Sequence, residues 1–187
     1  MRAMILEFPD DPGCDYLDRQ YMLGGDLLVA PVFRSDGVVD YYLPAGRWTH
    51  FLTGGVVEGG RWVREQHNFF SLPLLARPGA VIAVGANRER PDYDLADGVT
   101  FHVFAQCDGA ERTVTVPTLE GQAALQLVVR RKGNRLSLRA QGVAKPWRVL
   151  LRGVETLKAV MGGSAQEDDL GLLLTPDVGS TELVVTL

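Results

Sequence analysis

The stretch LQLVVRRKGNRLSLRA, residues 125–140, decides the fold class of this sequence. In both of its halves an apolar residue recurs at every second position: Leu125, Leu127, Val129, Leu136, Leu138 and Ala140. Gly133 and Asn134 lie between the halves and are typical of a tight hairpin turn. A period of two indicates half-buried β-strands, because successive side chains point to opposite faces of a sheet. The stretch therefore predicts an antiparallel hairpin with one buried face.

The pattern extends outward from this hairpin. Alternation returns over residues 101–105, 113–116, 147–152 and 182–187. Before residue 85, shorter apolar segments are separated by the turn residues at 44–46, 54–55, 59–60 and 77–79. Strands spaced by roughly 8–12 residues are typical of sandwiches and barrels. We predict an all-β chain built as two small antiparallel β-sandwich domains.

The first residues are expected to differ from this pattern. An apolar run over residues 1–8, closed by Pro9, predicts a buried strand. Asp11 and Pro12 are typical of the start of a helix, and residues at helical spacing predict a short helix over 12–22. Gly24 is expected to end that helix.

A polar stretch over residues 85–98 contains little apolar material and six charged side chains: Arg88, Glu89, Arg90, Asp92, Asp94 and Asp97. Domain boundaries commonly fall in such polar segments, because few contacts cross them. We therefore place a boundary near Asn87. The expected parts are residues 1–22, a first β-domain over 23–87 and a second β-domain over 88–187.

Composition excludes several classes of protein. The 187 residues are 46% hydrophobic, and 19 Lys and Arg face 23 Asp and Glu, for a net charge of −4. This balance excludes a disordered chain and disfavours nucleic-acid binding. The sequence has neither an apolar run long enough to span a membrane nor a secretion signal. Cys14 and Cys107 match no metal spacing, so free thiols in the cytoplasm are expected.

Residues that carry chemistry are sparse. His50, His67 and His102 form no HxH or HExxH pair, so no metal and no cofactor are expected. Acidic residues gather near the N-terminus: Glu7, Asp10, Asp11, Asp15 and Asp18. Paired carboxylates can act as acid and base. Acidic residues also cap helix starts, where the helix dipole favours them, and we favour this second interpretation.

Aromatic residues gather in one short region: Tyr41, Tyr42, Trp48, Phe51 and Trp62. An exposed aromatic ring stacks well on the apolar face of a sugar, so Trp48 and Trp62 are weak candidates for substrate binding. Both rings are equally suited to the core of a small sandwich. We favour the core interpretation.

Several ungapped blocks resemble glycoside hydrolase family 31, in its bacterial α-xylosidase branch. The block R-x-M-x-x-E-F-P-D-D runs from Arg2 to Asp11, and D-x-Q-Y-M-L-G runs from Asp18 to Gly24. An apolar L-L-V-A-P-V segment follows at 27–32, and Y-L-P-x-G-x-W follows at 42–48. The segments 71–73 and 90–93, with Arg77 between them, are also similar to that branch.

The resemblance implies a (β/α)8 barrel followed by a proximal and a distal β-domain. Residues 1–22 then correspond to a strand and helix left over from the barrel end. Such enzymes hydrolyse O-glycosidic bonds by a retaining mechanism with two aspartates, one as nucleophile and one as acid and base. Both aspartates belong to upstream barrel segments, so no catalytic residue is expected here, and the chain by itself is expected to be inactive.

The main hypothesis is therefore a non-catalytic C-terminal region that supports its own catalytic barrel and takes part in subunit contacts of a homo-oligomer. Neither a nucleic acid nor a membrane is an expected partner. One alternative is a stand-alone carbohydrate-binding module, for which residues 1–8 have no evident use. Another is a purely structural or interaction domain. The sugar specificity is not readable from these residues.

Overall fold

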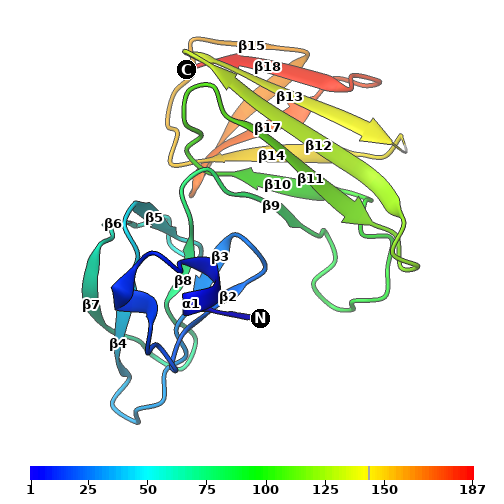
Figure 1. Ribbon diagram of the computed structural model, residues 1–187. Helices are drawn as coiled ribbons and strands as arrows, with labels where there is room; N and C mark the ends of the chain where they lie inside the picture. Colours follow the sequence, from blue (N-terminus) through cyan, green and yellow to red (C-terminus); the bar gives the residue numbers. More distant parts are fainter. Residues whose placement is uncertain (143) are drawn as a thin grey trace. The chain divides into compact units, whose positions relative to one another are not determined.

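The computed structural model describes residues 1–142 and 144–187. It contains two compact units, Met1–Pro78 and Gly79–Leu187, and each is described by itself. Nearly all regular structure is β-strand, which confirms the predicted all-β class (Figure 1).

The first unit combines a sheet with a separate two-stranded ribbon. Within the described residues, the sheet has the strand order β1-β2-β3-β8-β5-β6, and β4 pairs with β7 in the ribbon. The elements are β1 (Arg2–Ala3), α1 (Met4–Glu7), the 3-10 helix η1 (Pro12–Cys14), β2 (Tyr21–Leu23), β3 (Leu27–Val29), β4 (Val38–Leu43), β5 (Arg47–His50), β6 (Val56–Glu58), β7 (Arg61–Gln66) and β8 (Leu74–Ala76).

The core of this unit lies where the ribbon packs on the sheet. Val39, Tyr41 and Leu43 come from β4 and alternate with residues that face solvent. They join one buried cluster with side chains from the sheet and the N-terminal segment: Met4, Cys14, Met22, Leu28, Ala30, Trp48 and Leu75. The N-terminal segment thus belongs to the core of the first unit.

Two local predictions for this segment are wrong. The run 1–8 is not a strand: after the short β1, residues Met4–Glu7 form α1, which buries Met4 and leaves Ile5 and Leu6 exposed. The predicted helix over 12–22 is limited to η1, and residues Tyr21–Leu23 form β2. Strand β2 pairs with both β1 and β3, so tertiary pairing outweighs the local helical spacing.

The second unit is a sandwich of two sheets. Among the described residues, one sheet has the order β16-β17-β14-β10-β9 and the other β11-β12-β13-β18-β15 (Figure 1). The strands are β9 (Val81–Val84), β10 (Val99–Val103), β11 (Glu111–Pro117), β12 (Ala123–Lys132), β13 (Arg135–Gly142), β14 (Trp147–Arg152), β15 (Ala159–Met161), β16 (Gly163–Asp168), β17 (Gly171–Pro176) and β18 (Glu182–Thr186).

The predicted hairpin is confirmed as β12 and β13. Lys132 pairs with Arg135 across a turn in which Gly133 has φ +58°, a conformation that glycine adopts without a steric penalty. The alternating apolar residues of both strands enter a core that includes Phe101, Val149 and Leu183 from other strands. Within the described residues, β10 and β14 pair in parallel, which the sequence pattern did not predict.

The polar stretch 85–98 connects β9 to β10, two strands that pair in the second unit. One of its residues, Ala96, is fully buried in the core of that unit. By contacts, β9 therefore belongs to the second unit, whereas the sequence-based parts 23–87 and 88–187 stay a prediction.

Candidate functional site

The two candidate sugar-binding tryptophans have different surroundings. Trp48 is 1% exposed, and its Nε1 donates a 2.8 Å hydrogen bond to the carbonyl oxygen of Pro44. Trp62 is 60% exposed on β7 and makes an edge contact with the ring of Tyr42, with centroids 5.9 Å apart. Only the second ring therefore has the exposed area that stacking on a ligand requires. Sugar binding stays a prediction.

Trp62 belongs to the outward side of the ribbon, which we call the β4–β7 face. Because side chains alternate along a strand, every second residue of each strand lies on it. In the observed register these residues form three cross-strand rows, Tyr42 with Trp62, Asp40 with Arg64, and Val38 with Gln66. The face thus carries an aromatic pair, an ion pair, and a third pair in which Val38 lies beside the amide side chain of Gln66.

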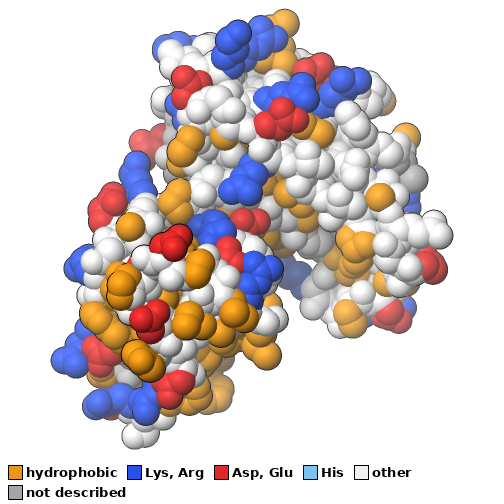
Figure 2. Space-filling model, in the orientation of Figure 1, with side chains coloured by type: hydrophobic (Ala, Val, Ile, Leu, Met, Phe, Trp, Pro, Cys, Tyr) orange, Lys and Arg blue, Asp and Glu red, His pale blue; other side chains and the backbone are white. Residues whose placement is uncertain are grey.

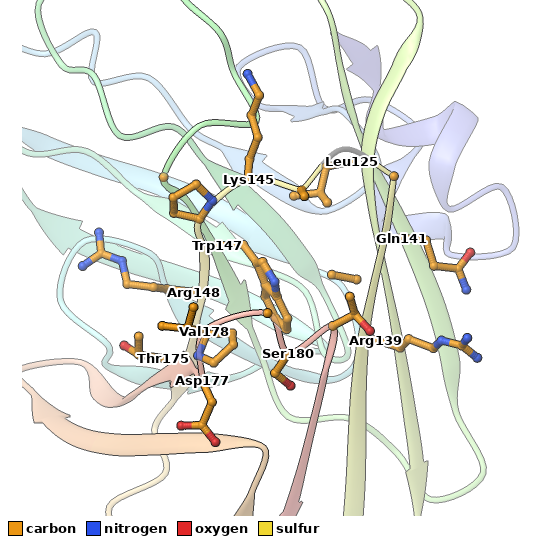
Figure 3. Close-up of a pocket in the computed structure, with 18 residues that line it drawn as sticks. Leu125, Arg139, Gln141, Lys145, Trp147, Arg148, Thr175, Asp177, Val178 and Ser180 are labelled. Atoms are coloured by element: carbon orange, nitrogen blue, oxygen red, sulfur yellow. The ribbon is translucent and has the colours of Figure 1, made fainter.

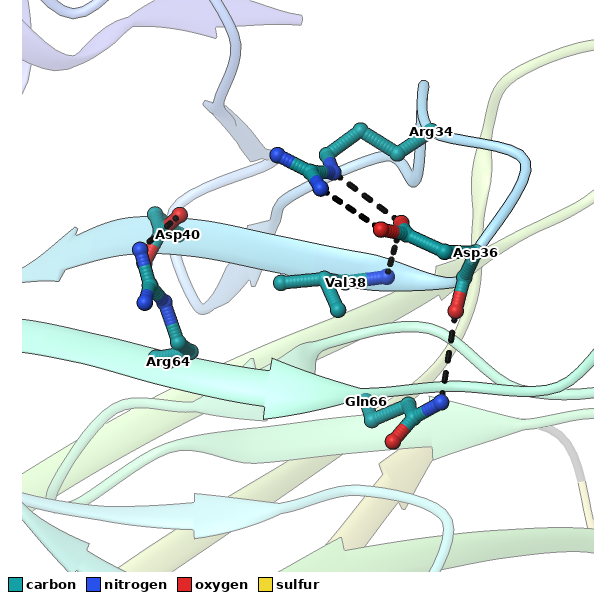
Figure 4. Close-up of polar contacts among 6 residues, drawn as sticks. All are labelled: Arg34, Asp36, Val38, Asp40, Arg64 and Gln66. Atoms are coloured by element: carbon teal, nitrogen blue, oxygen red, sulfur yellow. Dashed lines mark hydrogen bonds and ion pairs between the residues drawn. The ribbon is translucent and has the colours of Figure 1, made fainter.

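Two arginine–aspartate pairs and one amide hydrogen bond make up the polar part of this face and the turn beside it (Figure 4). Arg64 donates from Nε and Nη2 to the two carboxylate oxygens of Asp40, at 2.6 and 3.1 Å. At the adjoining turn, Arg34 makes the same two-fold contact with Asp36, at 3.0 and 2.6 Å. Gln66 donates from Nε2 to the carbonyl oxygen of Asp36 at 3.3 Å. Such bidentate pairs fix the orientation of both partners.

The two aspartates of these pairs, Asp36 and Asp40, are ionised near neutral pH. The hydrogen bond from Arg34, followed by that from the backbone of Val38, lowers the pKa of Asp36 to about 2. The hydrogen bond from Arg64 likewise lowers the pKa of Asp40. Each carboxylate is matched by one guanidinium, so the four side chains carry no net charge.

Residues of the N-terminal segment support Tyr42. Gln20 is 5% exposed, accepts from the backbone N–H of Tyr42 at 2.8 Å and donates to its carbonyl oxygen at 2.7 Å. The hydroxyl of Tyr42 donates to Asp11, whose oxygens lie 3.1 and 3.2 Å away. A Cβ atom on Gly13 would lie 2.4 Å from the Tyr42 ring, so this position needs glycine for the contact. Together these residues fix the ring against which Trp62 packs.

The acidic cluster has structural contacts. Asp11 accepts from the backbone N–H of Gly13 at 3.0 Å and so caps η1, as the favoured interpretation predicted. Glu7 pairs with Arg2 and with Arg77, whose Nη1 lies 2.8 Å from its Oε1. Within residues 1–142 and 144–187, no group of three or more His, Cys, Asp or Glu side chains is arranged to hold a metal ion.

Two histidines meet one carboxylate, a contact that sequence spacing did not predict. His50 Nε2 lies 2.9 Å from Glu65 Oε1, and His67 Nε2 lies 3.0 Å from Glu65 Oε2. His67 Nδ1 contacts the hydroxyl of Ser71 at 3.1 Å. Burial raises the pKa of Glu65, but the hydrogen bonds from the two histidines outweigh it and lower that pKa to about 2. The hydroxyl of Tyr41 is buried beside this cluster, and burial raises its pKa.

The third histidine lies in the other unit. His102 on β10 accepts from Arg152 Nη1 at 3.0 Å. Burial, followed by the charge of Arg152, lowers the pKa of His102 to about 4. This histidine is therefore neutral near pH 7.

One end of the sandwich in the second unit contains a pocket of about 880 Å³. Figure 3 shows Trp147 in its centre, while the charged ends of Arg139, Lys145 and Arg148 are directed away from that ring. The lining also includes the apolar residues Leu125, Pro146, Pro176 and Val178. Trp147 is only 7% exposed, so the ring closes the end of the core and offers little area for stacking.

Comparison with known proteins identifies the chain. Residues 1–82 match the family model described as glycosyl hydrolase family 31 C-terminal domain, and residues 94–187 match alpha-xylosidase YicI, C-terminal domain. The α-xylosidase of Emericella nidulans is 43% identical over 116 residues, 58% of this chain and 15% of that protein. The α-xylosidase XylQ of Lactiplantibacillus pentosus is 34% identical over 146 residues, 76% of this chain and 19% of that protein.

Solved structures agree with these matches. The family 31 dextranase of Flavobacterium johnsoniae superposes with a TM-score of 0.82 over 100% of this chain and 29% of its own; at 18% identity this shows the fold alone. The family 31 α-xylosidase of Xanthomonas citri has a TM-score of 0.64 and 27% identity over 81% of this chain and 18% of its own. The chain thus spans less than a fifth of the length of each of the three α-xylosidases named above. The chain belongs to glycoside hydrolase family 31, and it corresponds to the C-terminal β-domains of the α-xylosidase branch.

Proposed function

We propose that this chain works as the non-catalytic C-terminal β-region of a retaining α-glycosidase of the α-xylosidase or α-glucosidase type. The observation that carries the proposal is the pair of family matches, which together cover nearly the whole chain. Relatives at 43% and 34% identity that are named α-xylosidases support the substrate class. In this proposal the catalytic aspartates belong to the barrel of the longer enzyme.

The proposed partner is the catalytic barrel of the same enzyme. The first unit exposes many large apolar side chains, and Figure 2 shows hydrophobic side chains gathered on its surface. Such gatherings are typical of surfaces that bind another protein part. The most exposed are Met1, Leu6, Tyr16, Phe33, Phe69 and Phe70, each at least 71% accessible. A barrel packed on these side chains would remove them from water, which favours association.

The loop that carries Phe69 and Phe70 is held in a defined shape. Asn68 accepts from the backbone N–H of Phe70 at 2.9 Å, and the Ser71 hydroxyl donates to Asn68 Oδ1 at 3.1 Å. The two phenylalanine rings meet edge to face with centroids 6.1 Å apart. A rigid, exposed aromatic pair loses little conformational entropy on docking, so this loop is a suitable anchor for the barrel.

The remaining expectations belong to the same proposal. A boundary near residue 87 is supported by the two family matches, which end at 82 and begin at 94. A bacterial, cytoplasmic enzyme is proposed, and the free thiols of Cys14 and Cys107 support a reducing compartment. In the part of the chain that the structure describes, no helix has the length and apolar character that a membrane crossing requires. Self-association is a separate expectation, which light scattering on the chain tests.

Two measurements test the proposal. The purified chain is expected to release no product from chromogenic α-xylosides and α-glucosides, and turnover by this chain would contradict it. In a longer enzyme that includes the barrel, replacing Phe69 and Phe70 by alanine is expected to lower the unfolding temperature. The same change in the isolated chain is expected to have little effect, as is Val178→Ala in either protein, because Val178 is fully exposed in the second unit.

A further inference from the structure

The β4–β7 face presents a large aromatic ring, that of Trp62, to solvent in a fixed orientation. Trp62 leaves 60% of its area exposed, whereas the inward positions of the partner strand β4 are filled by the buried residues Val39, Tyr41 and Leu43. Its ring packs against that of Tyr42, and Tyr42 is in turn fixed by Gln20 and Asp11. An exposed indole held in one orientation is a preorganised surface for an apolar, flat ligand face.

The polar rows of this face favour an uncharged ligand. Asp36 and Asp40 are each neutralised by an arginine, so the face attracts neither anions nor cations strongly. Arg64 uses Nε and Nη2 on Asp40, and 74% of its side chain is exposed, so its remaining N–H groups face solvent. Carboxylate oxygens, guanidinium N–H groups and the Gln66 amide together present donors and acceptors at fixed positions.

The spacing of the rows suits an extended ligand. Trp62, Arg64 and Gln66 follow one another on the same side of β7, each about 7 Å from the next at the rise of a β-strand. A chain of sugar rings that stacks on Trp62 therefore meets the Asp40–Arg64 pair next and the amide of Gln66 after it. Hydroxyl groups can both donate to the carboxylate and accept from the guanidinium and the amide.

We propose that the β4–β7 face is a carbohydrate-binding surface on which a neutral oligosaccharide stacks on Trp62 and forms hydrogen bonds with Asp40, Arg64 and Gln66. The surface is assigned from geometry. The choice of α-linked gluco- and xylo-oligosaccharides as ligands rests on the proposed function. The role is to hold polymeric or branched substrate at the enzyme, and Trp48, which is buried, takes no part in it.

Tryptophan fluorescence provides the test. Trp48 and Trp147 are 1% and 7% exposed, so among the three tryptophans only Trp62 is positioned to respond to a surface ligand. The 187-residue chain is titrated with maltopentaose, isomaltopentaose and a xyloglucan oligosaccharide. We expect a saturable change with at least one of them. Trp62→Ala lacks this reporter ring and is measured by isothermal titration; it is expected to weaken binding about tenfold, near the upper end of what one aromatic contact contributes.

Two variants keep the result interpretable. Trp62→Phe retains a smaller ring and is expected to bind with intermediate affinity, measured by isothermal titration because its fluorescence is lost. Phe69→Ala removes a still more exposed ring from a loop of the same unit and is expected to leave sugar binding by the chain unchanged. Circular dichroism of each variant verifies that the first unit is folded.

The proposal is overturned if no sugar binds to the wild-type chain, or if folded Trp62→Ala binds as tightly as wild type. It is also overturned if the chain forms a dimer that Trp62→Ala dissociates while no sugar binds, because the face is then a protein interface. Each of these results would leave the proposed function standing. Hydrolysis of small chromogenic glycosides by the longer enzyme tests that function and does not need the β4–β7 face.

Discussion

Replacing Glu65 by glutamine tests the half-buried cluster that Glu65 forms with His50 and His67 in the first unit. The ionised carboxylate has only acceptors, so both histidine Nε2 atoms that contact it must donate, His50 at 2.9 Å and His67 at 3.0 Å. A glutamine side chain retains one acceptor oxygen and replaces the other with an NH2 group. That group faces the N–H of one histidine, which places two half-buried donors against each other with no acceptor between them.

The magnitude follows from the pKa of Glu65, which is lowered from 4.5 to about 2 in the folded chain. At about 1.36 kcal/mol per pKa unit this difference corresponds to about 3 kcal/mol. The carboxylate side chain is 22% exposed. Because solvent screens the interaction, we expect a loss of about 2 kcal/mol at pH 7.

The pH dependence has a definite sign. The folded pKa is lower than the unfolded one, so the stabilisation is fully present above about pH 4.5 and is lost as the pH falls toward 2. The difference in stability between wild type and Glu65→Gln should therefore be largest near pH 7 and shrink below pH 4.5.

Urea denaturation at pH 7 and at pH 3 measures this difference, with the fluorescence of the buried Trp48 as the probe of the first unit. The matched control is Glu58→Gln, which makes the same chemical change at an exposed position of β6 and should alter stability little. Equal denaturation midpoints for wild type and Glu65→Gln at pH 7 would refute the reasoning. So would a difference that is as large at pH 3 as at pH 7.

Three further predictions concern other parts of the chain. Leu127→Ala should destabilise the second unit by about 2–5 kcal/mol in urea denaturation, because Leu127 is fully buried in its core. Gly142→Ala should cost about 1–3 kcal/mol in the same assay, because its φ is +119° and the new Cβ would lie 2.4 Å from a backbone carbonyl oxygen. Gly109→Ala, where φ is +75° and the space is open, should cost less, and an equal loss would contradict the steric argument. A chromogenic thiol reagent should label Cys107 quickly and Cys14 only on unfolding, because Cys107 is exposed whereas burial raises the pKa of Cys14 to about 11; two equally fast thiols would contradict the placement of Cys14.

Strand periodicity was readable wherever one face of a strand meets the core and the other meets water. The hairpin of β12 and β13 is the clearest case, because its alternation and its Gly133 turn are local properties of the chain. Local signals failed in the N-terminal segment. There Tyr21–Leu23 forms a strand because β1 and β3 pair with it on either side. A local window of sequence does not contain these pairing partners.

The candidate site was only partly predictable, because burial depends on the whole first unit. Trp48 and Trp62 have similar local sequence surroundings, yet the first fills the core and the second stands on the β4–β7 face. The meeting of His50 and His67 at Glu65 likewise depends on how β5, β7 and the following loop fold together.

Composition, alternation and the ordered motifs of residues 2–48 were thus sufficient for the all-β class and the glycoside hydrolase family 31 resemblance, since both depend on local pattern. Which aromatic rings face solvent, which carboxylates meet arginines and which histidines share Glu65 were decided by the tertiary structure alone. The physical reason is that exposure and pairing are set by strand register and by packing between segments far apart in the chain.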